Sequence, residues 1–536
     1  MTTTQDATLR QKAAERFRSQ ITQGIVPRRK GPLPHPSTTD HGTTNMLQAT
    51  PKSAGNGQTP PVSETSYYSR MFGDLSPYSP DDRALGELGA PCGPMDANPP
   101  GTGKCLSPGS KVAENQLNTK LPAGYTYFGQ FLDHNITFQA DATFDPGNNP
   151  KGTTNYRSGR ISLEHVYGLG PQTQSFAYYD NGDNGKFWLD PARGYDVPRN
   201  GEGVPIIADP RNDNTIITIQ LHLAFMKFHN AVVDMLKKDD TPYVSDKDLF
   251  ATAQRLVIWH YQWLVLHDWL ENIIQKNVFE AITKNDGGRF FNPKPGESLA
   301  LPVEFTVAGY RLHALVQEEY RLNDKTAGHL FHFRKPFAPL TKDVDIIDWS
   351  HFFKIGGREP QYAKKFDGKI VHTFLNIPGP IDTPIEWIED PTEQSPLPSR
   401  TNEQYTPMRS IAIRNLLRGK AFNLPSGQDV ATKIQQAYGT EIVPKVYDNR
   451  ALGLTVNGLG DKAPLWYYVM RESMVAHGGE RLGAVGSVIV GEVLYGLLKA
   501  DPSSFVNHNR ENPGKKWEPM NGRFTVADML QLAGVA

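Results

Sequence analysis

The chain has 536 residues, of which 38% are hydrophobic and 21% charged, and its formal net charge is −1. This length can bury a large core, and the balanced charge excludes both a basic field for nucleic acid and an acidic tail. No run of eighteen apolar residues occurs, so we expect no transmembrane segment. The N-terminus also lacks the apolar run of a signal peptide. We therefore expect a cytoplasmic protein, and secretion by another route stays open.

Residues 1–66 are expected to form a poorly ordered N-terminal arm with one exposed helix over residues 7–22. The rest of this range is rich in Pro, Gly, Ser and Thr and holds few large apolar side chains, so it cannot build a core. Such an arm can wrap another subunit, and a homo-oligomer held through it is one expectation.

The chain has only two cysteines, Cys92 and Cys105. They could pair, but two cysteines do not make a disulfide framework, and no CxxC motif is present. We expect two free thiols in a reducing compartment.

A short apolar and aromatic stretch, GYTYFGQFLDHNITF over residues 124–138, carries several polar side chains. In a helix, Gln130 and His134 are four residues apart and share one face. A buried polar group must find a partner, because an unpaired one costs about 1–3 kcal/mol. The stretch therefore either packs a satisfied core histidine or lines a small polar pocket, and these residues alone favour neither.

The loop at residues 155–170 places oxygen-bearing side chains at intervals, at Ser158, Ser162 and Glu164. Oxygen ligands spaced in this way suit a hard cation such as Ca²⁺. On spacing alone, a solvated loop is the preferred interpretation.

Apolar residues recur at helical spacing in several later segments. We expect helices over residues 215–238, 251–275, 303–323, 411–423, 465–474 and 484–498. The histidine pairs His222/His229 and His260/His267 are seven residues apart. Two helical turns rise about 10 Å, too far for one metal ion, so we interpret all four as packing or surface residues. Tyr310 and His313, like Asn415 and Arg418, are three residues apart and thus neighbours on a helix.

Four separated segments together resemble the animal haem peroxidase (peroxidase–cyclooxygenase) superfamily, in a bacterial-type form. The matching motifs are GQFLDHN (129–135), DPR (209–211) before LHLAFMKFHN (221–230), EFTVAGYRLH (304–313) and RNLLRGKAFNLPSG (414–427). The C-terminal segments PLWYYV (464–469) and AVGSVIVGEVLYGLL (484–498) also fit the family. The resemblance implies one mainly α-helical catalytic domain over residues 67–536, with long irregular loops and very little β-structure.

On the proximal side, the resemblance assigns His313 to the haem iron as a neutral imidazole ligand. Asn415 would hold the other ring N–H of this histidine and set its basicity. Arg418 would pair with a haem propionate.

On the distal side, His134 would take a proton from the bound peroxide and return it to the leaving oxygen. Arg211 would stabilise the charge that develops as the O–O bond breaks. Gln130 would bind distal water or a small anion.

The chain departs from the mammalian members of the family at several positions. Asp133 occupies the first haem-ester position but Asn214 the second, so we expect haem b that is non-covalent or singly esterified through Asp133. Asn135 replaces the acid that ligates Ca²⁺. The family's other calcium segment matches Ser158, Arg160, Ser162 and Glu164, and Ca²⁺ is thus a possible second cofactor.

The sharpest departure is Tyr310-Arg311-Leu312-His313, which has no glycine before the histidine. This motif is similar to that of fatty-acid dioxygenases, in which a tyrosine three residues before the proximal histidine becomes a radical. Our first expectation is a peroxidase that uses hydrogen peroxide to oxidise a small organic or halide donor. The alternative is a fatty-acid dioxygenase with Tyr310 as the radical relay and a long apolar channel ending beside it. A non-enzymatic haem-binding protein is a third hypothesis.

Overall fold

The computed structural model describes residues 4–26, 66–97, 113–139, 149–179, 185–237, 246–297, 299–377, 409–519 and 522–536. The described fold is mainly α-helical, which confirms the expected fold class. The α-helices are α1 (Thr4–Thr22), α2 (Asp82–Gly89), α3 (Gly124–Ile136), α4 (Glu164–Tyr167), α5 (Ile216–Lys237), α6 (Asp246–Trp263), α7 (Glu271–Ile273), α8 (Lys276–Lys284), α9 (His372–Leu375), α10 (Ile411–Ala421), α11 (Gly427–Tyr438), α12 (Leu465–His477), α13 (Ala484–Ala500), α14 (Phe505–Glu511) and α15 (Val526–Ala533).

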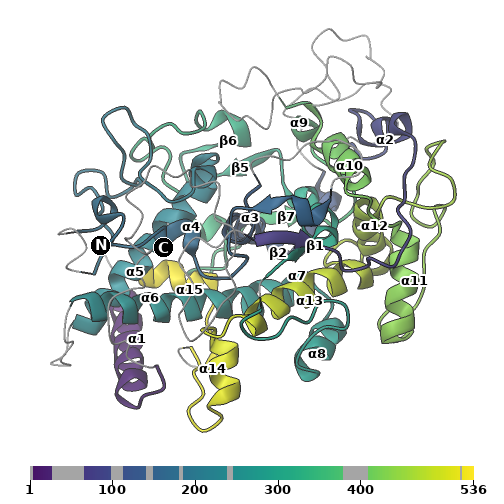
Figure 1. The fold of residues 1–536 in the computed structure, drawn as a ribbon. Helices are drawn as coiled ribbons and strands as arrows, with labels where there is room; N and C mark the ends of the chain where they lie inside the picture. Colours follow the sequence, from purple (N-terminus) through teal and green to yellow (C-terminus); the bar gives the residue numbers. More distant parts are fainter. Residues whose placement is uncertain are drawn as a thin grey trace, which may run out of the picture.

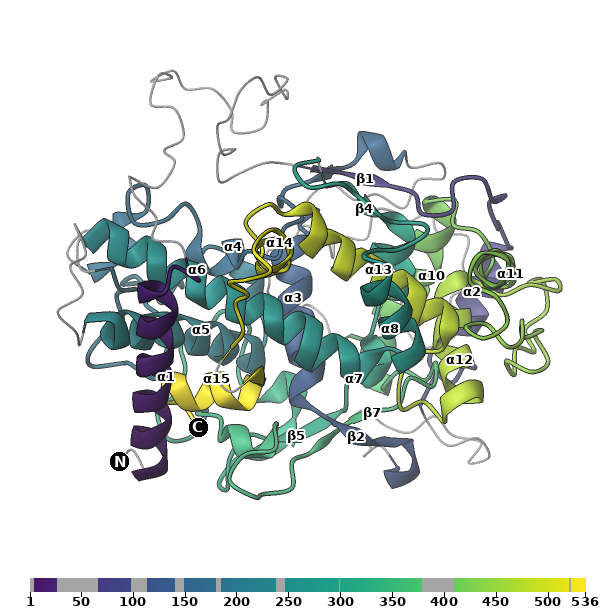
Figure 2. The ribbon, with the colours of Figure 1, turned by 90° about the horizontal axis from the view of Figure 1, so that it is seen from below.

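Helix α3 lies in the middle of the molecule, between two groups of helices (Figures 1 and 2). One group contains α1, α4, α5, α6 and α15, and the other contains α2, α8 and α10 to α13, with α9 next to α10 in Figure 1. Gly129 allows α3 to approach the Trp269 ring, because a Cβ at this position would lie 3.0 Å from Cζ2. The apolar side of α3 is packed in the core, with Phe128, Phe131 and Leu132 all fully buried. The segment that carries the polar motif is therefore the central helix of the fold.

The strands are few and short. β1 (Ser66–Ser69) lies between β3 (Thr154–Asn155), to which it is antiparallel, and β4 (Leu301–Pro302), to which it is parallel. β2 (Leu117–Pro122) pairs with β7 (Tyr362–Lys364), and β5 (Glu319–Arg321) with β6 (Ala327–His329), both antiparallel. These pairs connect loops and do not form a layer of their own.

The expected helix over residues 303–323 is wrong beyond its first turns. A π-helix, η7 (Phe305–Gly309), ends at Tyr310, a single 3₁₀ turn covers His313–Leu315, and β5 follows. Gly309 packs directly against α13, since a Cβ there would lie 2.6 Å from Cγ2 of Ile489. Tyr310 and His313 therefore do not share a regular helical face. π-helical turns are uncommon and often mark functional sites.

The helix expected near the N-terminus exists, but it is not exposed on all sides. Ala13, Phe17 and Ile21 of α1 are buried, and the Phe17 ring packs edge-to-face on the His260 ring at 5.1 Å. Helix α1 packs against α5 and α15. The boundary of the arm within residues 1–66 stays a prediction, because residues 27–65 lie outside the described part of the chain.

The expectation of free thiols is wrong for Cys92, which is disulfide-bonded. The only other cysteine, Cys105, lies outside the described residues. The sequence spacing did not reveal this bond, because pairing depends on how close the two Cα atoms come in the fold.

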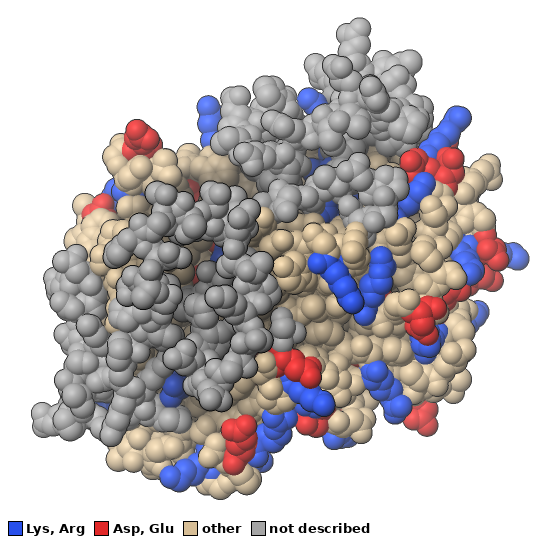
Figure 3. All heavy atoms as spheres, viewed as in Figure 1, with Lys and Arg blue, Asp and Glu red and all other residues tan. Residues whose placement is uncertain are grey.

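Helix α5 is long and apolar enough to cross a membrane by length and composition, but 83% of its most apolar window is buried inside the protein. It is thus a core helix. On the face shown in Figure 3, Lys and Arg side chains lie among Asp and Glu side chains, in keeping with the net charge of −1.

Candidate active site

One face of the central helix is polar and only partly covered. Thr126, Gln130 and Asp133 are partly exposed, whereas most other side chains of α3 are buried. Their spacing places them in one row along the helix. We call this row of partly exposed side chains the open face of α3, and His134 lies one turn beyond Gln130. Gln130 and Asp133, both predicted site residues, belong to this face.

The His134 ring is held by the amide of Asn212. Nδ1 of His134 lies 2.8 Å from Oδ1 of Asn212, and Nδ2 of Asn212 lies 3.0 Å from Nδ1 of His222. An amide oxygen can only accept a hydrogen bond, so the proton of neutral His134 is on Nδ1 and Nε2 carries a lone pair. Burial, and then the nearby Arg211 guanidinium, lower the pKa of His134. The ring is therefore a neutral base at neutral pH.

Arg211 is fixed beside His134 by a buried carboxylate and by the end of α3. Its Nε and Nη2 donate to Asp209 at 3.0 and 2.7 Å, and Nη2 also donates to the carbonyl oxygens of His134 and Thr137. Burial alone would raise the pKa of Asp209, but Arg211 and Arg157 together outweigh it and hold the pKa well below its usual range. Nη1 of Arg211 has no hydrogen bond to any described residue, so it remains available to a ligand.

The turn that carries Arg211 and Asn212 is itself anchored. Asp213 is fully buried and accepts hydrogen bonds from Arg199 at 2.8 and 2.9 Å and from Arg334 at 2.8 Å. Asp209 begins the turn by accepting from the backbone N–H of Arg211 at 3.0 Å. Bonded at both ends, the turn holds the two functional side chains in place.

His313 lies on the other segment of the site, close to α10. Nδ2 of Asn415 lies 3.1 Å from Nδ1 of His313. Burial, followed by the charges of Arg311 and Arg414, lowers the pKa of His313 to about 3, so the imidazole is neutral. The structure thus brings together the predicted ligand and its predicted partner, with the amide nitrogen rather than the oxygen facing the ring. A half-turn of the amide exchanges the two atoms, and Oδ1 would then accept from Nδ1–H.

Three arginines gather around this segment without a carboxylate. Arg311, Arg414 and Arg418 form no ion pair with any described residue, and Nε of Arg418 is buried without a partner. Burial, followed by the charge of Arg311, lowers the pKa of Arg414 and of Arg418 to about 10. Neighbouring buried cations need an anion. The cluster is a ready receptor for a ligand with carboxylate groups.

Two hydrogen bonds join the segment of His134 to the proximal side, one from the segment of His313 and one from α10. The hydroxyl of Tyr310, three residues before His313, donates to the carbonyl of Gly129 on α3 at 3.0 Å. Nη2 of Arg418 donates to Oε1 of Gln139, just beyond the end of α3. Four sequence-predicted segments thus meet around the open face of α3.

The residues predicted for calcium also come together, but they satisfy one another. Asn135 Oδ1 accepts from the backbone N–H groups of Ser162 and Leu163 at 3.2 Å, and its Nδ2 donates to the Arg160 carbonyl. Glu164 accepts from the backbone and hydroxyl of Ser158, and burial raises the pKa of Glu164 to about 7. No group of three or more acidic, histidine or cysteine side chains that could hold a metal occurs in the described residues. This donor set is poor in charge for Ca²⁺.

Two residues of the site go beyond the prediction from sequence: Asn212, which was not predicted, and His222, whose spacing predicted a packing or surface residue. Both are buried, and both belong to the chain of hydrogen bonds that ends at His134. His229 and His260 are buried packing residues, as expected. Asn212 could have been found from the sequence, because it directly follows the predicted site residue Arg211.

The chain was compared with known families and structures. Residues 176–346 match the family model described as animal haem peroxidase. The fold is similar to a fatty acid alpha-dioxygenase from Arabidopsis thaliana, with a TM-score of 0.50 and 15% identity over 87% of this chain and 80% of that one. Peroxidase A from Dictyostelium discoideum has a TM-score of 0.50 and 12% identity over 87% of this chain and 92% of that one. A sequence search of curated proteins gave no match. At these identities, the two solved structures establish the fold alone.

Proposed function

We propose that this chain, which belongs to the animal haem peroxidase superfamily, binds haem between His134 and His313 and oxidises a small donor with hydrogen peroxide. The observation that carries the proposal is the Asn212 amide, which leaves a lone pair on Nε2 of His134, while the Arg211 guanidinium is close enough to lower the pKa of that ring and donates to the His134 carbonyl. This pairing of base and cation is what breaking a peroxide requires.

The residues present fit haem. The arginine cluster of Arg311, Arg414 and Arg418 has no carboxylate partner among the described residues and matches the two propionates of the group. His313 is neutral and carries an amide partner, as an iron ligand needs. The open face of α3 offers Asp133 where a single ester could form. Haem, when bound, supplies the redox centre at which the O–O bond of peroxide is broken.

The side chains around that group would move one proton and hold one charge. Nε2 of His134 accepts the proton of the first peroxide oxygen and returns it to the second. Nη1 of Arg211 faces the developing negative charge, while its Nη2 stays bonded to Asp209. Gln130, one turn before His134 on the same face, binds water or a small anion there. Two electrons and two protons from the donor convert one hydrogen peroxide to two waters.

The second candidate function is a fatty-acid dioxygenase, and Tyr310 is the observation that favours it. The hydroxyl of Tyr310 is buried, its pKa is raised by burial, and it lies near the open face of α3 through its bond to Gly129. A radical relay would require that hydroxyl to face a substrate carbon. In the structure it donates to a backbone carbonyl, which favours the peroxidase.

One pair of assays separates the two functions. The haem-loaded enzyme is given hydrogen peroxide with guaiacol, and in parallel palmitate in an oxygen electrode. We expect dye oxidation without lipid, little oxygen uptake with palmitate, and dye oxidation that survives Tyr310→Phe. Palmitate-dependent oxygen uptake that Tyr310→Phe abolishes would establish the dioxygenase in its place.

A further inference from the structure

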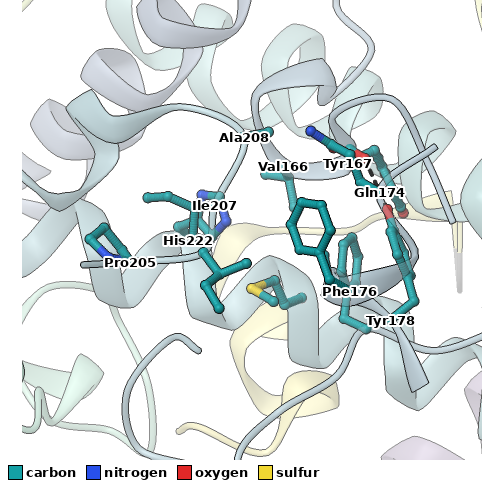
Figure 4. Close-up of a pocket in the computed structure, with 13 residues that line it drawn as sticks. Val166, Tyr167, Gln174, Phe176, Tyr178, Pro205, Ile207, Ala208 and His222 are labelled. Carbon is teal, nitrogen blue, oxygen red and sulfur yellow. Dashed lines mark hydrogen bonds between the residues drawn. The ribbon is translucent and has the colours of Figure 1, made fainter. Parts of the chain in front are cut away.

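A cavity of about 270 Å³ lies next to the turn that carries Arg211 and Asn212, since Ala208 and His222 are among its lining residues (Figure 4). Most of its lining residues are apolar or aromatic, with Phe176, Tyr178, Phe187, Ile207 and Met226 among them, and polar atoms contribute as much of the lining surface as apolar atoms do. No lining residue is an Asp, Glu, Lys or Arg. Burying a charge in such surroundings is costly, so the cavity suits an uncharged molecule.

The polar groups of the cavity are few. His222 lines it, and because Nδ1 of His222 accepts from Asn212, the ring proton is on Nε2. Burial lowers the pKa of His222 to about 4, so the ring is neutral at neutral pH. Gln174 accepts from the backbone N–H of Leu169 at 3.0 Å, and its NH₂ group has no partner among the described residues. The cavity therefore offers N–H donors to an oxygen acceptor.

The mouth of the cavity is marked by an exposed aromatic. Phe176 lines the cavity, yet 63% of it is exposed to solvent. Val204, next to the lining residue Pro205, is 52% exposed. The exposed ring of Phe176 therefore places the opening of the cavity at the protein surface.

We propose that this cavity binds a small uncharged phenol, whose ring packs between Phe176 and Met226 and whose oxygen accepts the Nε2–H of His222. A cavity of about 150 Å³ holds one benzene ring, so the space here suits one substituted ring and not a long acyl chain. That such a molecule is a reducing donor rests on the proposed peroxidase function. The binding of the phenol in this cavity does not depend on that function.

The cavity is coupled to the distal base by hydrogen bonds. An oxygen that accepts from Nε2 of His222 makes Nδ1 a stronger acceptor for the Asn212 amide. The amide oxygen then becomes a stronger acceptor for Nδ1–H of His134. A phenol bound in the cavity thus makes His134 more basic. As the pH is lowered, the rate of peroxide consumption should then begin to fall at a higher pH than it does without phenol.

The test measures phenol binding to the full-length haem-loaded protein by isothermal titration calorimetry. Ala177→Phe fills the cavity and should weaken binding at least tenfold, and Phe176→Ala, at an exposed position that tolerates change, should weaken it several-fold. Ala192→Phe places the same ring on an exposed alanine outside the cavity and should leave binding unchanged. Benzoate, which is charged, should not bind. Equal phenol affinity in all three variants, or benzoate binding as tightly as phenol, overturns the proposal.

Further readouts separate this inference from the proposed function. If phenol binds and Ala177→Phe weakens it but peroxide is not consumed, the cavity is supported and the peroxidase function fails. If the enzyme consumes peroxide and the KM for phenol is the same in Ala177→Phe as in the wild type, the peroxidase stands and the donor site fails. If a saturating amount of phenol does not change the pH at which the rate of peroxide consumption begins to fall, the proposed coupling to His134 is wrong.

Discussion

At the scale of single residues, Asn212 decides what His134 can do. Its amide is the only group in the described chain bonded to Nδ1 of His134, and it keeps Nε2 free of a proton. His222 fixes the amide from the other side. The position of the proton on His134 is thus set by two neighbouring residues that take no part in the proposed proton transfer.

We expect Asn212→Ala to slow the peroxide reaction by about 10- to 100-fold. A positioned base accelerates a proton transfer by about 10²–10⁴-fold, and the variant should lose part of this acceleration. Without the amide oxygen, the His134 ring can hold its proton on either nitrogen. The measurement is the second-order rate of peroxide consumption by stopped flow. Asn457→Ala, at an exposed asparagine without a side-chain hydrogen bond to a described residue and outside the four site segments, is the matched control. An Asn212→Ala rate equal to that of the control contradicts the role.

The pH dependence follows from the same histidine. Burial and Arg211 lower the pKa of His134 below 6.5, and only its deprotonated form accepts a proton. Activity should therefore stay level as pH falls to 6.5 and decline only below it. The rate of peroxide consumption against pH, without added phenol, checks this. A decline that begins above pH 6.5 would show that the histidine is not in this environment.

At the scale of elements, the π-helix η7 positions the proximal segment. It ends at Gly309, which packs on Ile489 of α13, and the chain turns there to present Tyr310 and His313. The sequence predicted one helix through residue 323 because apolar residues continue at helical spacing. It could not reveal that a tertiary contact would end the helix.

Gly309→Ala should lower the free energy of unfolding by about 1–3 kcal/mol, since the new methyl group overlaps Ile489. It should also weaken haem binding, because the displaced segment carries His313. Denaturant unfolding and haem titration measure the two effects. Gly514→Ala, which meets no atom within 4 Å, is the matched control and should change neither. Equal stability of both variants would contradict the packing argument.

The loop at residues 155–170, which was predicted to bind calcium, can be tested separately. Asn135 and Glu164 already accept the N–H groups that organise the loop. We therefore expect the melting temperature to be unchanged by EDTA and by added Ca²⁺. A drop in melting temperature on chelation, reversed by Ca²⁺, would show that the cation does bind here.

At the scale of the whole molecule, motifs far apart in the sequence meet around one helix. Most helices and the pairing of His313 with Asn415 were predictable, because helical spacing and family motifs are local signals. The packed side of α1 and the disulfide of Cys92 were not, since each depends on distant residues. The same holds for the cavity beside His222, whose lining residues lie between positions 166 and 226 but meet only in the fold.

The central claim is that haem is held between His134 and His313, with His313 as the iron ligand. The most direct measurement is haem titration of the purified chain, followed by the Soret band, for wild type, His134→Ala and His313→Ala. We predict one haem per chain in wild type and in His134→Ala, and a lost or much weaker Soret complex in His313→Ala. An unchanged Soret band and haem stoichiometry in His313→Ala would contradict the account.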